Sequence, residues 1–389
     1  MQATGEGVAV TTTAPPIVID RPPHGPARWW LAHARFAAAV ALVLGVVVTA
    51  LGAGIGIRRL TKTGLTWTAL IGLLMLVAGL SLLAYAWRVF WRATHRWQRL
   101  WFVPVVLVAL LTMSSIAQGG MLAYAPRNSL GSTTPAVEGL TYRDVTFRTS
   151  DGVRLSAWFI PSVNHAAVVT MPGSGSNRSA TLGQATVLAR HGYGVLMVDP
   201  RGQGRSGGHA MDAGWYGDRD LTAAVTFLQR QPGVDATRIG VLGLSMGGEA
   251  AIGAAAADPA IRAVVTEGAT GRTAADKAGY LPGGVLGAIQ RGLDRLTYGT
   301  AALLSPAPQP GTLHRAIGQA QSTAFLLIAG SKAVDEADAV GHLRTAAPGR
   351  VQTWTVAGAT HTHGLATAPQ QWTTRVVTFL DHALGIATR

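Results

Sequence analysis

The chain has 389 residues, of which only 13% are charged, and its mean hydropathy of +0.27 is high for a soluble globular protein. It contains no cysteine, which excludes disulfides, thiolate catalysis and cysteine-ligated zinc. The net charge of +13 does not indicate a nucleic-acid partner, because residues 1–125 hold ten Lys and Arg residues against two Asp and Glu residues, and these bases flank apolar runs.

Residues 1–35 are predicted to form a disordered tail. The segment is rich in Pro, Thr and Gly, with proline pairs at Pro15-Pro16 and Pro22-Pro23, and it holds too little apolar surface to order itself. The first long apolar run begins only at Phe36, too far from the start for a simple signal peptide.

Three charge-free apolar runs then predict three transmembrane helices over residues 36–124. Each run has about 20 residues or more, the length that a helix needs to cross a bilayer core of about 30 Å. Seven of the eleven tryptophans lie between Trp29 and Trp101, near the ends of the runs, as in an interfacial belt. The runs are 36–56, 65–87 and 100–124.

The distribution of basic residues predicts the orientation of these helices. Seven arginines would share the side of the N-terminus, and four basic residues would lie on the opposite side. Basic loops favour the cytoplasm, so we expect a multi-pass protein of the cell membrane with its C-terminal domain outside the cytoplasm. No ionisable residue interrupts the runs, which favours anchoring over transport.

After a linker at 125–140, residues 141–389 predict a globular α/β domain. Short β-branched runs alternate with Ala-rich helical stretches, and Ser150-Asp151-Gly152 marks a hairpin between the first two strands. The sheet should therefore begin antiparallel and continue parallel. The predicted strands are 142–148, 153–160, 166–171, 194–198, 238–244, 261–266, 323–329 and 351–356.

Ser245 is the candidate nucleophile of this domain. It stands in Gly243-Leu244-Ser245-Met246-Gly247, between an apolar strand and an Ala-rich helix, where a sharp turn would expose its hydroxyl. The same Gly-x-Ser-x-Gly pattern occurs around Ser206, but that serine lies in a Gly-rich loop without a flanking strand and helix. We interpret Ser206 as a loop residue.

From Tyr142 onward the chain resembles the α/β-hydrolase superfamily, in particular dienelactone-hydrolase-like and serine-aminopeptidase-like enzymes. The segment from Ala167 to Arg178 looks like the family's oxyanion strand and loop, although Pro172 replaces the usual histidine. The motif from Asp199 to Ser206 looks like a structural motif of the family. The resemblance implies an eight-stranded, mostly parallel sheet with helices on both faces and a small helical lid.

A serine nucleophile needs a histidine base and a carboxylate that orients it, in the chain order Ser, acid, His in this fold. The resemblance favours His361 as the base, with His363 as the alternative. After the strand 323–329 the family's usual acid position holds Ala333. Asp335 is therefore the first candidate acid and Glu336 the alternate, whereas Asp338 is expected to begin the next helix.

The oxyanion hole is expected to consist of the backbone N–H groups of Ser174 and Met246. An insertion at about 268–321 follows the strand that ends at Thr266, and it is expected to form the lid.

These features predict a membrane-anchored serine hydrolase acting on carboxylic esters or related acyl compounds. An acyltransferase with the same triad is the alternative, and a catalytically silent interaction domain is a third. We expect a small-molecule or lipid-like acyl substrate, membrane lipids around three helices, no cofactor, no metal and no nucleic acid. Neither the oligomeric state nor the subtype of hydrolase follows from the sequence.

Overall fold

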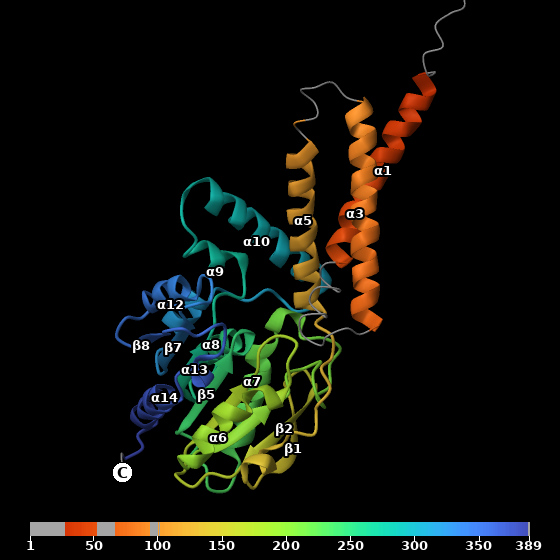
Figure 1. Ribbon diagram of the computed structural model, residues 1–389. Helices are drawn as coiled ribbons and strands as arrows, with labels where there is room; N and C mark the ends of the chain where they lie inside the picture. The colour runs from red at the N-terminus through yellow and green to blue at the C-terminus, as the bar shows by residue number, and fades with distance from the viewer. Residues whose placement is uncertain (1–27, 53–66, 94–99, 101, 388–389) are drawn as a thin grey trace, which may run out of the picture. The chain divides into compact units, whose positions relative to one another are not determined.

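The computed structural model describes residues 28–52, 67–93, 100 and 102–387, and the chain divides into two compact units, 1–110 and 111–389 (Figure 1). Most of the predicted tail lies outside the described residues. Residues 28–35 were predicted as tail but are helical, and α1 spans Arg28–Gly52. The tail prediction was wrong there because this stretch contains no proline and is rich in Ala, Leu and Trp, which a helix accepts.

The first unit contains α1 and α3, which spans Trp67–Ala93, and the two helices pack through glycines. A Cβ atom on Gly52 would lie 2.3 Å from the backbone nitrogen of Leu76, and one on Gly79 would lie 2.4 Å from that of Thr49. Small residues at these crossings let the two backbones approach closely.

Two described helices are long and apolar enough to cross a membrane: residues 70–92, with mean hydropathy 2.2, and residues 103–123, with mean hydropathy 1.8. The second belongs to α5, which spans Phe102–Ala123. The described part of the predicted first span, Phe36–Gly52, has 17 residues. Residues 53–56 of that prediction lie outside the described residues.

The second unit contains a single eight-stranded sheet with the order β1-β2-β4-β3-β5-β6-β7-β8. β2 pairs antiparallel with both β1 and β4, and all other pairs are parallel. This confirms the predicted sheet, and every strand end lies within one residue of its expected position. The strands are β1 Arg143–Arg148, β2 Arg154–Ile160, β3 Ala167–Met171, β4 Gly194–Val198, β5 Ile239–Leu244, β6 Ile261–Glu267, β7 Ala324–Gly330 and β8 Val351–Val356.

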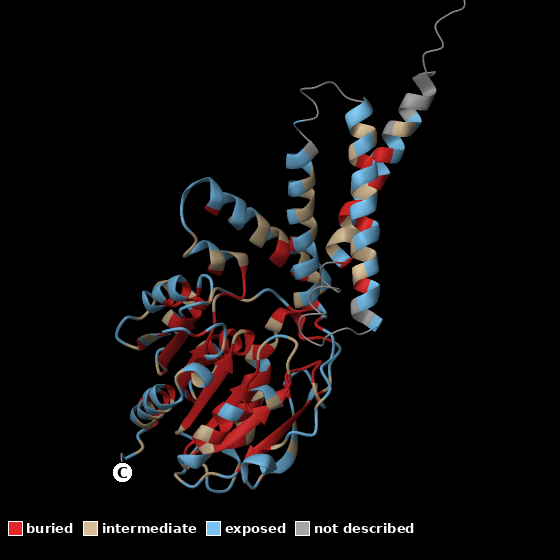
Figure 2. Cartoon of the chain, in the orientation of Figure 1, coloured by how far each residue is buried: buried red, intermediate tan, exposed pale blue. Residues whose placement is uncertain are grey.

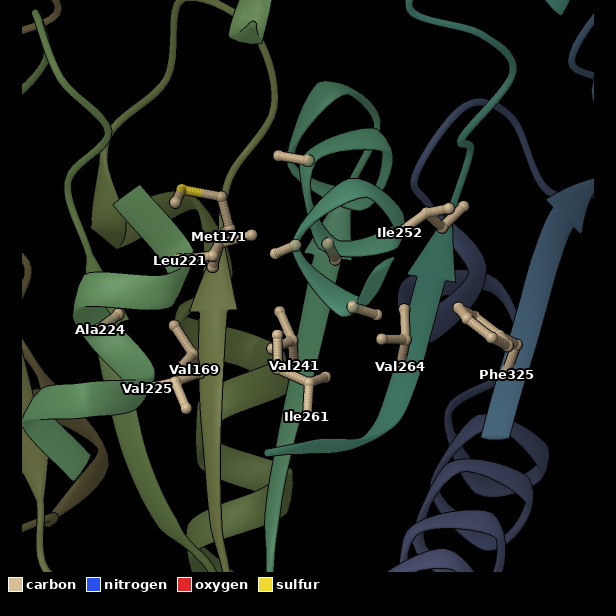
Figure 3. Packing of buried hydrophobic residues seen from close by; sticks show 14 of the residues in the cluster. Val169, Met171, Leu221, Ala224, Val225, Val241, Ile252, Ile261, Val264 and Phe325 are labelled. Atoms are coloured by element: carbon tan, nitrogen blue, oxygen red, sulfur yellow. The ribbon is translucent and has the colours of Figure 1, made fainter. Parts of the chain in front are cut away.

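Helices cover both faces of the sheet, as the α/β-hydrolase fold requires (Figure 2). Alternate residues of a strand point to opposite faces, so Val241 packs with one helical layer and Leu242 with the other. Figure 3 shows the first of these cores, where β3, β5, β6 and β7 meet α7 and α8. That layer comprises α7 Gly217–Gln229, α8 Met246–Ala257, α11 Leu313–Gln319 and α12 Glu336–Arg344, and the opposite one α6 Leu182–Arg190 and α14 Pro369–Leu384.

The segment between β6 and β7 has two parts. Helices α9 (Ala274–Ala278) and α10 (Gly284–Leu304) are additions to the sheet and its helical layers. Helix α11 instead buries Leu313 and Ile317 against the core and packs on α8. The part with the position expected of a lid is therefore α9 and α10.

Residues 125–140, predicted as a linker, dock onto the sheet domain. Arg127 donates hydrogen bonds to the backbone oxygens of Ser206 at 2.8 Å and Gly208 at 3.0 Å, and also contacts those of Gln203 and Gly204. The side chain of Gln203 in turn accepts a hydrogen bond from the backbone N–H of Asn128 at 2.7 Å. The segment is thus held along the domain from its first residues.

Candidate active site

Ser245 occupies the sharp turn between β5 and α8. Its backbone angles, φ 52° and ψ −122°, lie in a region that non-glycine residues rarely adopt, as expected of a nucleophile elbow. A Cβ atom on Gly243 would lie 2.3 Å from the carbonyl carbon of Gly247. One on Gly247 would lie 2.3 Å from the backbone oxygen of Met171. Both glycines are therefore required for this turn.

His361, from the loop after β8, connects Ser245 to a buried carboxylate. Its Nε2 atom lies 2.9 Å from Ser245 Oγ, and its Nδ1 atom lies 2.5 Å from Glu336 Oε1. Only 2% of the Glu336 side chain is exposed. The three side chains therefore form a continuous hydrogen-bonded chain of hydroxyl, imidazole and carboxylate.

The carboxylate at His361 is that of Glu336, the alternate candidate, rather than that of Asp335, the first. Asp335 is exposed and precedes α12 in a left-handed conformation with φ 66°. Glu336 begins α12 and turns inward, where its second oxygen accepts a hydrogen bond from the backbone N–H of Gly330 at 2.7 Å. The choice of Asp335 was wrong because the left-handed residue redirects the chain and brings the next side chain to the histidine.

The hydrogen bond that His361 donates to Glu336 raises the pKa of His361 above its ordinary value of 6.5, although partial burial opposes this shift. The charges of Glu336, Glu249 and Glu267 act in the same direction as the hydrogen bond. The environment thus stabilises a protonated imidazole, which is the form that a base reaches after it removes a proton.

The two predicted oxyanion donors belong to segments that adjoin Ser245. Met246 is the first residue of α8, so its backbone N–H has no acceptor within the helix and lies at the positive end of the helix dipole. Ser174 follows Gly173 in the loop after β3, and a Cβ atom on Gly173 would lie only 3.2 Å from Ser245 Cβ. The loop therefore approaches the serine closely.

Two further residues support the histidine, and sequence reasoning missed both. Gly268 has φ 77°, and a Cβ atom there would lie 2.8 Å from His361 Nδ1. The buried carboxylate of Glu267 accepts hydrogen bonds from the backbone N–H of Gly364 and from Trp372 Nε1, and burial raises its pKa. The sequence feature that could have indicated these roles is the Glu267-Gly268 pair, which directly follows the predicted strand 261–266.

Ser206 has a structural role, as its sequence context indicated. Its side chain is buried, donates to the backbone oxygen of Asp199 at 2.7 Å and accepts from the backbone N–H of Ser156 at 2.9 Å. Asp199 forms a fully buried ion pair with Arg178 at 2.9 Å. These contacts join the loop after β4 to the neighbouring strand and loop.

His363, the alternative base, bonds through Nδ1 to the backbone oxygen of His361 at 2.7 Å. Within the described part of the chain, no three His, Asp or Glu side chains lie close enough together to hold a metal ion.

Comparisons with known proteins agree with this fold. The sequence profile of the X-Pro dipeptidyl-peptidase family (S15) matches residues 127–375. The crystal structure of the esterase Pf2001 from Pyrococcus furiosus is similar with a TM-score of 0.53 and 26% identity, covering 67% of this chain and 97% of the esterase.

Two curated fungal proteins are similar over shorter segments. The thiohydrolase aneE of Aspergillus aculeatus is 35% identical over 134 residues, which is 33% of this chain and 42% of that protein. The polyketide transferase grgF of a Penicillium species is 34% identical over 127 residues, which is 31% of this chain and 43% of that protein. The chain thus spans less than half the length of either relative.

Proposed function

Because this chain belongs to the X-Pro dipeptidyl-peptidase (S15) family of α/β hydrolases, we propose that it is a serine hydrolase that cleaves carboxylic esters or related acyl compounds. The observation that carries the proposal is the hydrogen-bonded chain of Ser245, His361 and Glu336 at the elbow. The similarity to an esterase and to a thiohydrolase supports an acyl substrate.

In the proposed reaction Ser245 Oγ attacks the acyl carbonyl carbon while His361 Nε2 takes the hydroxyl proton. Glu336 keeps the other proton of the ring on Nδ1 and stabilises the imidazolium. The backbone N–H groups of Met246 and Ser174 would bind the oxyanion. His361 then gives its proton to the leaving alcohol, and a water molecule, deprotonated by the same histidine, releases the acid and restores the serine.

A fluorophosphonate probe tests this assignment, because it phosphonylates an activated serine without requiring knowledge of the substrate. The full chain in membranes should be labelled, Ser245→Ala should not, and the matched Ser206→Ala should still be labelled. Failure of the wild-type chain to react, or equal labelling of Ser245→Ala, contradicts the proposal. Turnover of p-nitrophenyl butyrate and of an X-Pro p-nitroanilide by the unlabelled wild-type protein, with Ser245→Ala as the blank, then distinguishes an esterase from a peptidase.

Acyl transfer is a second candidate function, favoured by the similarity to a polyketide transferase. It would use the same acyl-enzyme, but an alcohol would replace water in the second half of the reaction. Product analysis with increasing concentrations of an alcohol acceptor separates the two. A transferase yields mainly the new ester at low acceptor concentration, whereas a hydrolase yields the free acid.

We also propose that the N-terminal helices anchor the enzyme in the cell membrane, with its hydrolase domain outside the cytoplasm. The apolar stretches in α3 and α5 support anchoring, and the bias of seven arginines on one side against four basic residues on the other supports the orientation. A membrane-impermeant fluorophosphonate probe should label intact cells as strongly as lysed cells. Labelling only after lysis contradicts the orientation.

A further inference from the structure

One face of α10 fixes the helix to the rest of the domain. Thr297, Tyr298 and Ala301 are buried, and the hydroxyl of Tyr298 donates to the backbone oxygen of Gly271 at 2.6 Å. Tyr298 and Ala301 share an apolar cluster with Trp215. This face, in the C-terminal half of the helix, determines which side of α10 points away from the domain.

Exposed apolar side chains lie at both ends of α10, on the same side of the helix. Val285 and Leu286 are 77% and 81% exposed, Ile289 is 48% exposed, and Leu303 is 85% exposed. Positions 285, 286, 289, 293, 296, 303 and 304 share one side of the helix and hold only Val, Leu or Ile, and of these Leu293 and Leu296 in the middle are half-buried. An apolar stripe of this kind on a helix surface indicates a site that contacts a protein or a membrane.

The stripe continues onto the end of α5. A Cβ atom on Gly119 would lie 2.3 Å from the backbone oxygen of Thr297 and 2.7 Å from Thr300 Cβ, so the two helices are in close contact. The hydroxyl of Tyr124 donates to the backbone oxygen of Leu304 at 2.8 Å. Residues 103–123 of α5 are apolar enough to cross a membrane, and in their most apolar stretch of 18 residues only 11% of the residues are buried. The outward face of α10 therefore adjoins a helix suited to lipid.

The chain leaving α5 leads directly to the candidate active site. Ala125 packs with Met211 and with Met246, the residue after the nucleophile. The side chain of Asn128 donates to the backbone oxygen of Gly175, in the loop that approaches Ser245, at 3.3 Å. The residues that follow α5 therefore contact both Met246 and the loop that approaches Ser245.

We propose that the outward face of α10 lies in the surface of the lipid bilayer, and that the enzyme takes amphiphilic acyl esters from it. The apolar stripe would rest among the lipid chains next to the end of α5, as an in-plane amphipathic helix does. An ester anchored in the bilayer would then meet the oxyanion loop and Ser245 where it leaves the lipid. The substrate class rests on the proposed hydrolase function, whereas the membrane contact does not.

Lipid quenching tests the membrane contact without reference to activity. The chain contains no cysteine, so Leu286→Cys provides a single labelling site on the stripe. Val163→Cys is the matched control, because Val163 is 76% exposed but lies in the loop between β2 and β3. Each variant of the full chain carries an environment-sensitive fluorophore and is reconstituted in phosphatidylcholine vesicles with spin-labelled lipid.

The fluorophore at residue 286 should be quenched by the lipid, and that at residue 163 should not. Equal quenching at both positions, or none at residue 286, overturns the proposal. A signal at residue 286 that depends on protein concentration and not on the lipid quencher would assign the stripe to a second copy of the chain, which also overturns it.

The substrate class is tested by the double variant Leu286→Gln, Ile289→Gln. The ratio of its activity on a long-chain ester embedded in vesicles to its activity on p-nitrophenyl butyrate should fall about tenfold or more, because two apolar side chains no longer enter the lipid. An unchanged ratio overturns the substrate assignment. Loss of both activities together with fluorophosphonate labelling would indicate misfolding, and the same ratio measured for the single variant Leu286→Gln then decides the substrate assignment.

Discussion

Replacing Glu336 by glutamine tests the interpretation of the site most directly. In the native structure one oxygen of the buried carboxylate faces His361 Nδ1 at 2.5 Å, and the other accepts from the backbone N–H of Gly330 at 2.7 Å. Glutamine has nearly the same shape but only one acceptor oxygen. It therefore cannot accept a hydrogen bond from both neighbours.

Either orientation of the new amide is unfavourable. If its NH2 group faces the N–H of Gly330, a buried donor is left without an acceptor, at a cost of about 1–3 kcal/mol. If its NH2 group faces His361, the ring must carry its proton on Nε2, where it cannot accept the proton of Ser245. We expect the second orientation, and a wrong tautomer lowers kcat of a serine triad by about 10⁴-fold, or about 5.5 kcal/mol.

The assay is the rate of fluorophosphonate labelling, and of ester turnover, as a function of pH. Only neutral His361 acts as a base, and its pKa is raised above 6.5 chiefly by the hydrogen bond that it donates to Glu336. In the native protein the rate should therefore rise with pH through a midpoint above 6.5. In Glu336→Gln the midpoint of the remaining activity should move to lower pH, since the main cause of the upward shift is lost.

Asp335→Asn is the matched control, because the exposed Asp335 makes no contact with His361 and asparagine tolerates its left-handed backbone. It should retain native rates and the native midpoint. A large loss in Asp335→Asn together with near-native rates in Glu336→Gln would refute the assignment of the acid. Near-native rates in both would refute a role for either carboxylate.

Three further substitutions have defined expectations. Gly268→Ala should slow labelling by about 10²-fold with little change in affinity for substrate, because its Cβ atom would lie 2.8 Å from His361 Nδ1 and displace the ring; unchanged labelling would contradict this contact. Asp199→Ala should lower the free energy of unfolding by about 3–5 kcal/mol in urea titrations of the detergent-solubilised chain, because it leaves the buried Arg178 uncompensated. Arg127→Ala should lower that free energy by about 1.5–3 kcal/mol in the same titration, because its hydrogen bonds to the backbone oxygens of residues 203–208 are lost. An unchanged urea midpoint would indicate that residues 125–140 are not fixed to the domain.

Most of the sheet domain could be predicted from the sequence, because each buried strand is a short β-branched run bounded by turn residues. For the N-terminal helices the comparison is narrower, because it covers only their described residues. The apolar run that starts at Phe36 predicts a full span, of which the structure describes only Phe36–Gly52. Likewise, the insertion after β6 appeared uniform, although Leu313 and Ile317 belong to the core.

The candidate site was partly predictable. Ser245 could be identified because its pattern stands between a strand and a helix. The acid could not, because Asp335 and Glu336 are adjacent and the backbone conformation of Asp335 decides which of them faces His361. Gly268 was missed for a different reason. It leaves room for Glu336 and His361, which lie far along the chain, and no local sequence pattern indicates that a side chain must be absent here.

The docking of residues 125–140 determines where an independently folding enzyme should begin. A fragment that starts at residue 141 would lose Arg127 and Asn128, and with them the partners of the Gln203–Gly208 turn. It would also uncover Met246, whose side chain is now 6% exposed beneath Ala125. Removal of the N-terminal apolar helices for crystallisation should therefore leave Ala125 and everything after it in place, because Ala125 packs directly on Met246 beside the candidate nucleophile.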